Sequence, residues 1–237
     1  MNHQPTIGLI VPPAAGKVPS DAALLYGDRY RFIARGLGIG AISPGGFAPV
    51  VDTIVQRAVE LREAGAEVVS LMGTSLSFYR GPDFTETLRQ KMQEATGVPC
   101  TTMSHAIVAA LRQLGVRRVA VATSYIDELN DRLVTYLTAS GFTVTAIDGM
   151  SITGVEAVGE VSTQALVDLS RRVYERDRSA DGVFISCGGL LTLDAIRELE
   201  GTLGLPATAS SPAGFWDVVR LGGWDASSAG FGRLFAG

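Results

Sequence analysis

Two distant stretches of this chain share a sequence pattern, and this repeat constrains the fold more than any other feature. The segment GVPCTTMS, which begins at Gly97, is similar in sequence to GLPATASS, which begins at Gly204. In each copy another glycine follows 18 residues after the first, at Gly115 and Gly222, where a helix is expected to end. Internal repeats indicate that one structural unit occurs more than once. The chain is therefore expected to fold as two similar halves.

The repeat extends to the apolar runs that precede it. VVSLMGTS at Val68 resembles VFISCGG at Val183, and TIGLIVPP at Thr6 has a counterpart in VAVATSY at Val119. Short apolar runs bounded by glycine or proline are typical of parallel strands that are covered on both faces. The predicted strands are Thr6–Val11, Val68–Met72, Val119–Ala122, Phe142–Ile147 and Val183–Ser186.

Helical patterns separate these strands. The predicted helices are Pro49–Ala64, Phe84–Thr96, Ser104–Leu114, Glu128–Thr138, Thr163–Arg176, Leu193–Thr202 and a last helix that ends at Arg220, with Ser211 as cap and Pro212 as first residue. Strands that alternate with helices predict an α/β fold with two pseudo-symmetric Rossmann-like lobes, each a parallel sheet flanked by helices. The first lobe is expected to contain residues 1–103 and 212–237, and the second residues 104–211. The active site is expected in the cleft between the lobes.

Composition excludes several classes of function. The net charge is −4 without a basic stripe, so a nucleic-acid partner is not expected. No apolar run reaches the roughly 18 residues of a membrane span, and Met1–Thr6 lacks the pattern of a signal peptide, so a cytoplasmic protein is expected. Two Cys and two His argue against a disulfide scaffold or a zinc site, and neither G-x-G-x-x-G nor a P-loop lysine follows the first strand.

The strand that begins at Val183 runs directly into Cys187-Gly188-Gly189. In open α/β sheets, ligands bind where strands end, and bare glycine N–H groups can approach an anion closely. Cys187 is therefore a candidate for chemistry, although a small buried cysteine can simply fill a core. The repeat aligns Cys100 with Ala207, away from the strand ends, so Cys100 is expected to be structural.

Three other segments have two interpretations each. Leu37–Phe47 is glycine-rich with apolar residues between, as in a mobile flap or a plain surface turn. Tyr125 is either a ligand-binding hydroxyl at a strand end or a loop aromatic that packs on the core. Thr74 and Ser75 follow a strand end directly, where they can bind a ligand, cap the next helix, or do both.

The two-lobed pattern resembles the aspartate/glutamate racemase superfamily, in which a cysteine at each of two strand ends flanks the substrate. This chain has Gly73 at the first of these positions. With one thiol in place of two, and with GTSLSFYRG from Gly73, SCGGLLTLDAI from Ser186 and SSPAGFWD from Ser210, it is similar to the arylmalonate decarboxylases over nearly its whole length.

This resemblance implies a cofactor-free decarboxylation of α-aryl(-α-methyl)malonates through an enediolate, with no metal. It implies that Cys187 is the proton donor and that Thr74, Ser75, Tyr125 and Gly188 form a dioxyanion hole with their hydroxyl and amide donors. The implied pocket consists of Pro12, Pro13, Ile39, Ile42, Phe47, Gly73, Leu76, Val155 and Val158. The expected partner is a small dicarboxylate, and the expected state is a monomer.

Two rival interpretations remain at this stage. A racemase or maleate isomerase would use the same scaffold, but both usually need two thiols. A non-catalytic receptor also has two lobes around a cleft, but the missing signal peptide and the thiol at the cleft argue against it.

Overall fold

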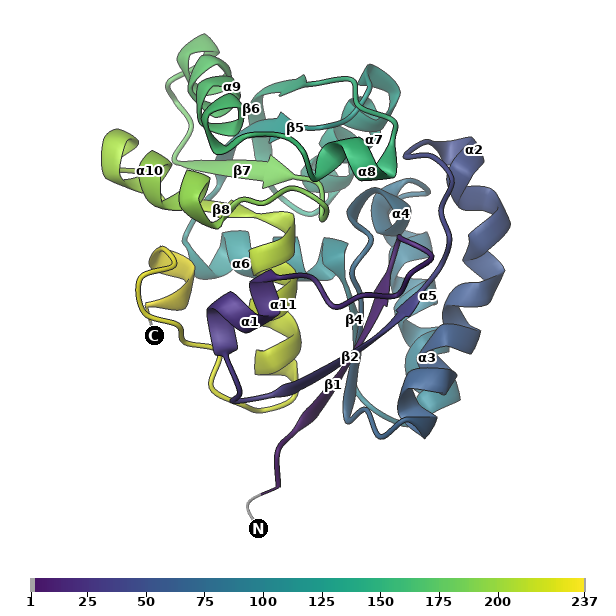
Figure 1. Cartoon of the computed structure of the whole chain (residues 1–237). Coiled ribbons are helices and arrows are strands. Elements are labelled where there is room, and N and C mark those ends of the chain that lie inside the picture. The colour runs from purple at the N-terminus through teal and green to yellow at the C-terminus, as the bar shows by residue number, and fades with distance from the viewer. Residues whose placement is uncertain (1–2, 237) are drawn as a thin grey trace.

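The chain folds into two lobes, each built on a four-stranded parallel sheet, in a computed structural model that describes residues 3–236 (Figure 1). The first sheet has the order β2-β1-β3-β4 and the second the order β6-β5-β7-β8, so the same topology occurs twice. The strands are β1 (Thr6–Val11), β2 (Arg31–Gly36), β3 (Val68–Leu71), β4 (Cys100–Thr102), β5 (Arg118–Thr123), β6 (Thr143–Gly149), β7 (Gly182–Ser186) and β8 (Ala207–Ala209). The predicted α/β fold with two similar lobes is confirmed.

Helices cover both sheets. They are α1 (Asp21–Tyr26), α2 (Pro44–Phe47), α3 (Ile54–Glu63), α4 (Thr74–Phe78), α5 (Pro82–Thr96), α6 (Met103–Gln113), α7 (Asp127–Ala139), α8 (Val155–Val158), α9 (Thr163–Arg176), α10 (Leu193–Leu203) and α11 (Ser210–Leu221), with 3-10 helices η1 (Ala48–Thr53) and η2 (Arg233–Phe235). Helix α3 packs against β1, β2 and β3, and α9 packs against β5, β6 and β7.

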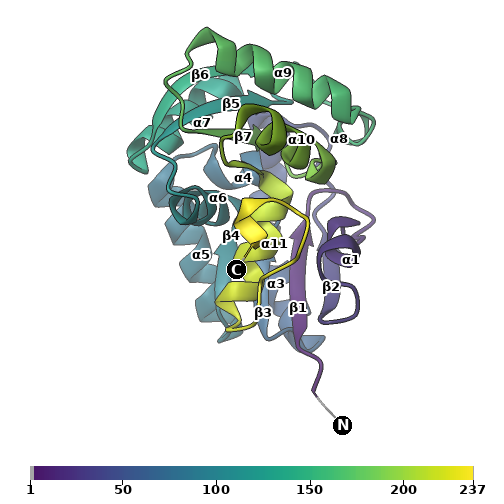
Figure 2. The ribbon, with the colours of Figure 1, turned by 90° about the vertical axis from the view of Figure 1, so that its left-hand side faces the viewer.

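Helices α6 and α11 pack against each other at the junction of the lobes (Figure 2). Each follows the last strand of one sheet, so they are equivalent members of the repeat. Helix α11 contacts β3 and β4 of the first sheet and also β7 and β8 of the second, and α6 likewise contacts both β4 and β8. The exact lobe boundaries stay a prediction. Residues 1–2 and 237, which the predicted first lobe and the segment Met1–Thr6 include, lie outside the described part of the chain.

The strand register fixes which residues of the two lobes are equivalent. Val69 of β3 pairs with Cys100 of β4, and Val183 of β7 pairs with Ala207 of β8. Four residues beyond Val69 and Val183, at the carboxyl ends of their strands, lie Gly73 and Cys187. The register thus aligns these two residues, as the sequence repeat suggested.

Some element boundaries differ from the predicted ones. The helix predicted at Pro49–Ala64 begins as η1, in which the Thr53 hydroxyl donates to the Val50 carbonyl over 2.7 Å, and becomes α-helical only at Ile54. Its apolar face is buried as expected. Three strands were not predicted. Strand β2 lies at an edge of its sheet, and its arginines break the apolar pattern. Strands β4 and β8 are only three residues long, too short for a recognisable pattern.

The predicted cap of the last helix is wrong. Helix α11 begins at Ser210, with Ala209 at the N-cap position and no side-chain cap. The Ser210 Oγ instead accepts a hydrogen bond from the Cys187 N–H, and the Ser211 hydroxyl donates to Asp21. Both serines make their hydrogen bonds outside the helix because the end of β7 and helix α1 pack against its first turn.

Leu37–Phe47 is not a plain surface turn. Leu37, Ile39, Ile42 and Phe47 are all buried, and the Ile42 N–H donates to the Thr153 carbonyl of the second lobe over 2.9 Å. The segment therefore connects the two lobes across the cleft. The other interpretation, a flap that moves, stays a prediction.

Candidate active site

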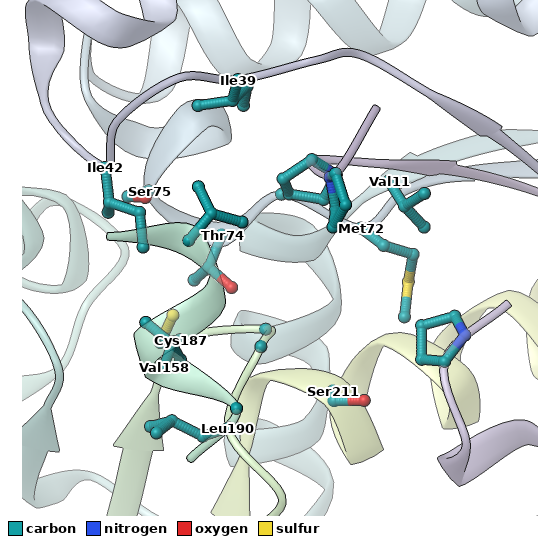
Figure 3. A pocket seen from close by; sticks show the side chains of 18 of the residues that line it. Val11, Ile39, Ile42, Met72, Thr74, Ser75, Val158, Cys187, Leu190 and Ser211 are labelled. Atoms are coloured by element: carbon teal, nitrogen blue, oxygen red, sulfur yellow. The ribbon is translucent and has the colours of Figure 1, made fainter. Parts of the chain in front are cut away.

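A cavity of about 300 Å³ lies between the lobes, at the carboxyl ends of their central strands. Every residue predicted for the pocket lines it, and so do all those predicted to act on the substrate (Figure 3). These are Pro12, Pro13, Ile39, Ile42, Phe47, Gly73, Thr74, Ser75, Leu76, Tyr125, Val155, Val158, Cys187 and Gly188. Because they come from both halves of the chain, the cavity exists only when the lobes are joined.

Cys187 occupies a sharp turn directly after β7. Its φ angle of 152° lies in a region that L-residues rarely adopt. The hydrogen bond from its N–H to the Ser210 Oγ, 3.2 Å long, fixes this turn against α11. Such local strain is common at functional sites, where the surrounding structure holds a side chain in one direction.

The thiol of Cys187 is 6% exposed and stays protonated at neutral pH. Burial raises its pKa above the ordinary value of about 8.5, and the Ser124 hydroxyl, the Gly189 N–H and the Tyr125 hydroxyl offset part of this increase. Ser124 Oγ is buried without a conventional hydrogen-bond partner in the described chain, so it is free to stabilise a thiolate formed beside it. The site therefore favours a thiol that can donate a proton.

Hydroxyl groups gather beside this thiol. Thr74 Oγ1 is buried and has no hydrogen-bond partner among the described residues, and it lies 3.5 Å from where a Cβ of Gly188 would be, next to Cys187 in the chain. The Tyr125 hydroxyl accepts a 3.4 Å hydrogen bond from Ser186 and lies beside Thr74 and Ser75. Burial raises the pKa of Tyr125 well above its ordinary value, so the phenol remains neutral and can donate.

The capping interpretation of Thr74 and Ser75 is wrong. Helix α4 begins at Thr74 itself, its N-cap is Gly73, and no side chain caps it. Tyr125 packs on the core, since it is fully buried and its ring lies edge-on against Phe78 at a centroid distance of 5.9 Å. It also lines the cavity, and its role as a ligand-binding hydroxyl stays a prediction. These hydroxyls are thus available to a ligand.

The rest of the cavity wall is mainly apolar. Ile39, Ile42 and Phe47 come from the segment that bridges the lobes, Leu76 from α4 and Val158 from α8. Gly73 lies at the strand end equivalent to that of Cys187, and the atoms nearest to where its Cβ would be belong to the Leu76 side chain and the Pro12 ring, at 3.3–3.7 Å. That strand end therefore carries no acid.

Sequence reasoning missed several lining residues. Asp21 and Ser211 form a buried pair at the cavity wall, and further members are Val11, Lys17, Val18, Pro19, Ser20, Met72, Glu156, Gly159, Leu190 and Leu191. Gly189, which the sequence placed beside Cys187, also lines the cavity. The loop after β1 brings several of them back to the cavity. The sequence does not predict that this loop contacts the cavity, because the loop has no regular periodicity.

Within residues 3–236, no three His, Cys, Asp or Glu side chains lie close enough together to hold a metal ion. Over the same range, no helix is long and apolar enough to cross a membrane.

Comparison with known proteins agrees with this geometry. Residues 7–235 match the family model described as arylmalonate decarboxylase. The chain is 56% identical to the arylmalonate decarboxylase of Bordetella bronchiseptica over 98% of its own length and 96% of that protein. The chain belongs to the arylmalonate decarboxylase family. It is accordingly a decarboxylase.

Solved structures of arylmalonate decarboxylase superpose closely on the chain. A double mutant in its liganded form has a TM-score of 0.97 at 55% identity, covering 98% of this chain and 99% of that one. The unliganded enzyme gives 0.89 at 55% identity, with the same coverage. The maleate isomerase of Nocardia farcinica is more distant, at 25% identity over 96% of this chain and 94% of that protein. A structure of that isomerase bound to TRIS has a TM-score of 0.89 at 22% identity, covering 98% of this chain and 97% of that one, and shows the shared fold alone.

Proposed function

We propose that this enzyme decarboxylates α-aryl- and α-aryl-α-methylmalonates to α-arylacetates and α-arylpropionates, without a cofactor and with one product enantiomer from a prochiral substrate. The observation that carries the proposal is the site itself: a protonated thiol and free hydroxyl donors line one largely apolar cavity, and the strand end equivalent to that of the thiol is a glycine. Membership of the arylmalonate decarboxylase family gives the substrate class.

The retained carboxylate is assigned to the hydroxyl donors. When CO₂ leaves, the electron pair of the broken C–C bond spreads onto this carboxylate and forms an enediolate with two oxyanions. Thr74, Ser75 and Tyr125, with the amides of Ser75 and Gly188, bind these oxygens more strongly as their charge grows. Each preorganised donor of this kind lowers a barrier by about 3–4 kcal/mol.

The departing carboxylate is assigned to the apolar wall. It is charged, whereas the CO₂ that it becomes is neutral. Ile39, Ile42, Phe47, Leu76 and Val158 offer it no hydrogen bond, and all five are less than 10% exposed. A carboxylate held there lacks its normal hydration, so its loss as CO₂ is favoured.

Cys187 then protonates the α-carbon. Its S–H bond breaks, a C–H bond forms, and the thiolate left behind recovers a proton from solvent. Ser124, the Gly189 N–H and Tyr125 stabilise that thiolate meanwhile. Because the enediolate is planar and Gly73 has no acidic group, only one face receives a proton.

The proposal is tested by measuring CO₂ release from phenylmalonate and methylphenylmalonate in metal-free buffer with EDTA, and the enantiomeric excess of the arylpropionate formed. Rapid release that EDTA does not change, with a single enantiomer, supports it. Absence of release from both substrates contradicts it. Maleate, aspartate and glutamate are then assayed, because maleate isomerization or racemization is the alternative function on this scaffold.

The predicted monomeric state and cytoplasmic location stay predictions. In residues 3–236, the exposed large apolar side chains are Leu24, in α1, and Leu191, in the loop between β7 and α10. Size-exclusion chromatography with light scattering tests the monomer.

A further inference from the structure

Two carboxyl side chains line the cavity, and the buried one, Asp21, has no part in the proposed reaction. Asp21, at the start of α1, is only 3% exposed. Burial raises its pKa above the ordinary range, and the Ser211 hydroxyl is the one group that offsets this. Burying a carboxyl group without a cation beside it costs free energy unless hydrogen bonds to the protein or to a ligand compensate for the lost hydration.

The carboxyl group of Asp21 is held in place but not saturated. The Ser211 hydroxyl donates to Oδ2 over 2.6 Å, and this is its single side-chain hydrogen bond among the described residues. Oδ1 is left free to accept from a molecule in the cavity. Because Ser211 belongs to the first turn of α11, the hydrogen bond also fixes the direction of the carboxyl group.

Ser211, the hydrogen-bond partner of Asp21, lies away from Ser75, one of the groups assigned to the retained carboxylate (Figure 3). Figure 3 shows Ser211 on the α11 side of the cavity, with Ser75 and Ile42 at the opposite side and Cys187 nearer to them. The cavity thus has donors and apolar side chains at one end and a hydrogen-bond acceptor at the other.

We propose that Asp21 is a specificity-determining residue that accepts a hydrogen bond from a donor on the aryl ring of the substrate, such as a phenolic hydroxyl or a ring N–H. This inference rests on the proposed function, because the malonate group must occupy the end of the cavity near Cys187. The aryl ring then extends toward α11. An anionic or strongly polar acceptor there also repels a malonate carboxylate, which disfavours the reversed binding mode.

Two other charged side chains line the cavity, and neither neutralises Asp21. Lys17 and Glu156 are both exposed, whereas Asp21 is buried, and Asp21 forms no ion pair within residues 3–236. Glu156 therefore offers a control in which a negative charge is removed from the cavity rim rather than from its buried end.

The test compares kcat/KM for 3- and 4-hydroxyphenylmalonate with that for phenylmalonate, in the wild type, Asp21→Ala and Glu156→Gln. In the wild type, at least one of the hydroxylated substrates is expected to be preferred. Asp21→Ala is expected to lower the preference about 10- to 100-fold, mainly through KM, because a hydrogen bond to the ring forms equally in ground state and transition state. Glu156→Gln is expected to retain the preference.

A binding experiment separates this inference from the proposed reaction. Calorimetry measures the affinities of phenylacetate and the two hydroxyphenylacetates for the wild type and Asp21→Ala, with no turnover. Suppose that the wild type releases no CO₂ but binds a hydroxylated ligand more tightly than phenylacetate, and that Asp21→Ala loses this preference. The proposed decarboxylation is then contradicted, whereas the role of Asp21 is supported. If neither assay shows a preference that depends on Asp21, or if all ligands weaken equally along with the melting temperature, Asp21 has only a structural role and the inference is overturned.

Discussion

The equivalent strand ends of the two lobes carry different chemistry. In the first lobe, β3 leads into Gly73, Thr74 and Ser75, which provide hydroxyl groups but no acid. In the second lobe, β7 leads into Cys187 and two glycines, which provide an acid and accessible backbone but no hydroxyl. A repeated fold thus surrounds a single cavity with unlike groups. The two faces of a bound substrate therefore meet different environments, as an enantioselective protonation requires.

The neighbouring strands differ in the same way. The register between β1 and β3 and that between β5 and β7 align Pro13 with Tyr125. Proline has no N–H and no hydroxyl to donate, whereas the Tyr125 hydroxyl is kept neutral and available. The side of the cavity near Pro13 is therefore suited to an apolar part of the substrate.

The largest effect is expected when the acid is removed. Cys187→Gly makes the second strand end like the first and suits the φ angle of 152° at this position. We expect kcat for methylphenylmalonate to fall about 10²- to 10⁴-fold, the range for loss of a general acid, with the melting temperature nearly retained. Cys100→Ala is the matched control, since Ala207 occupies the equivalent position in the other lobe. Equal losses in both variants would contradict the role of Cys187.

The next largest effect is expected when a hydroxyl is removed from the first strand end. Thr74→Val keeps the shape of the side chain but removes its free donor, and we expect kcat to fall about 10²- to 10³-fold. Thr208→Val is the control, because Thr208 Oγ1 is also buried and without a partner but does not line the cavity. A change in KM alone for Thr74→Val would show that the hydroxyl only binds the ground state.

A smaller loss, together with a new activity, is expected when the first strand end gains an acid. The Cβ of Gly73→Cys would meet Leu76 at 3.3 Å, a contact that a small movement of that side chain relieves. We expect decarboxylation to fall about tenfold because the apolar wall is narrowed. Two acids on opposite faces should also exchange the α-proton of arylpropionates in D₂O and racemize them. The absence of this exchange would contradict the opposed geometry.

The smallest effect concerns pH. Reaction requires the protonated thiol, and burial raises the pKa of Cys187, so activity should persist above pH 8.5 and decrease only as the thiol ionises at higher pH. The pH profile of kcat/KM measures this directly. An alkaline decrease centred below pH 8 would indicate that the donors around the sulfur outweigh its burial.

Sequence alone predicted the parts of the fold that follow from buried apolar runs. The strands that end near Val11, Met72 and Cys187 were found because each is a continuous apolar run, and the repeat gave their symmetry. Ser211 was misread as a cap because Ser-Pro is a common helix start, and only the packing of α1 against α11 shows its bond to Asp21.

The cavity residues were predicted in a different way. Ile39, Ile42 and Val158 came from a family resemblance, because no spacing or periodicity brings them together with Cys187. Asp21 could not be predicted at all, since its place depends on how the loop after β1 returns to the cavity. Contacts between distant segments are determined by tertiary packing, which local sequence patterns do not encode.

The most direct test of the central claim exchanges the residues at the two strand ends. The double variant Gly73→Cys with Cys187→Gly moves the thiol to the opposite lobe and leaves the hydroxyl donors in place. The enantiomeric excess of the product from methylphenylmalonate is then compared with that of the wild type. If the two strand ends face opposite sides of the enediolate, the variant produces the opposite enantiomer in excess. Excess of the original enantiomer would contradict the account.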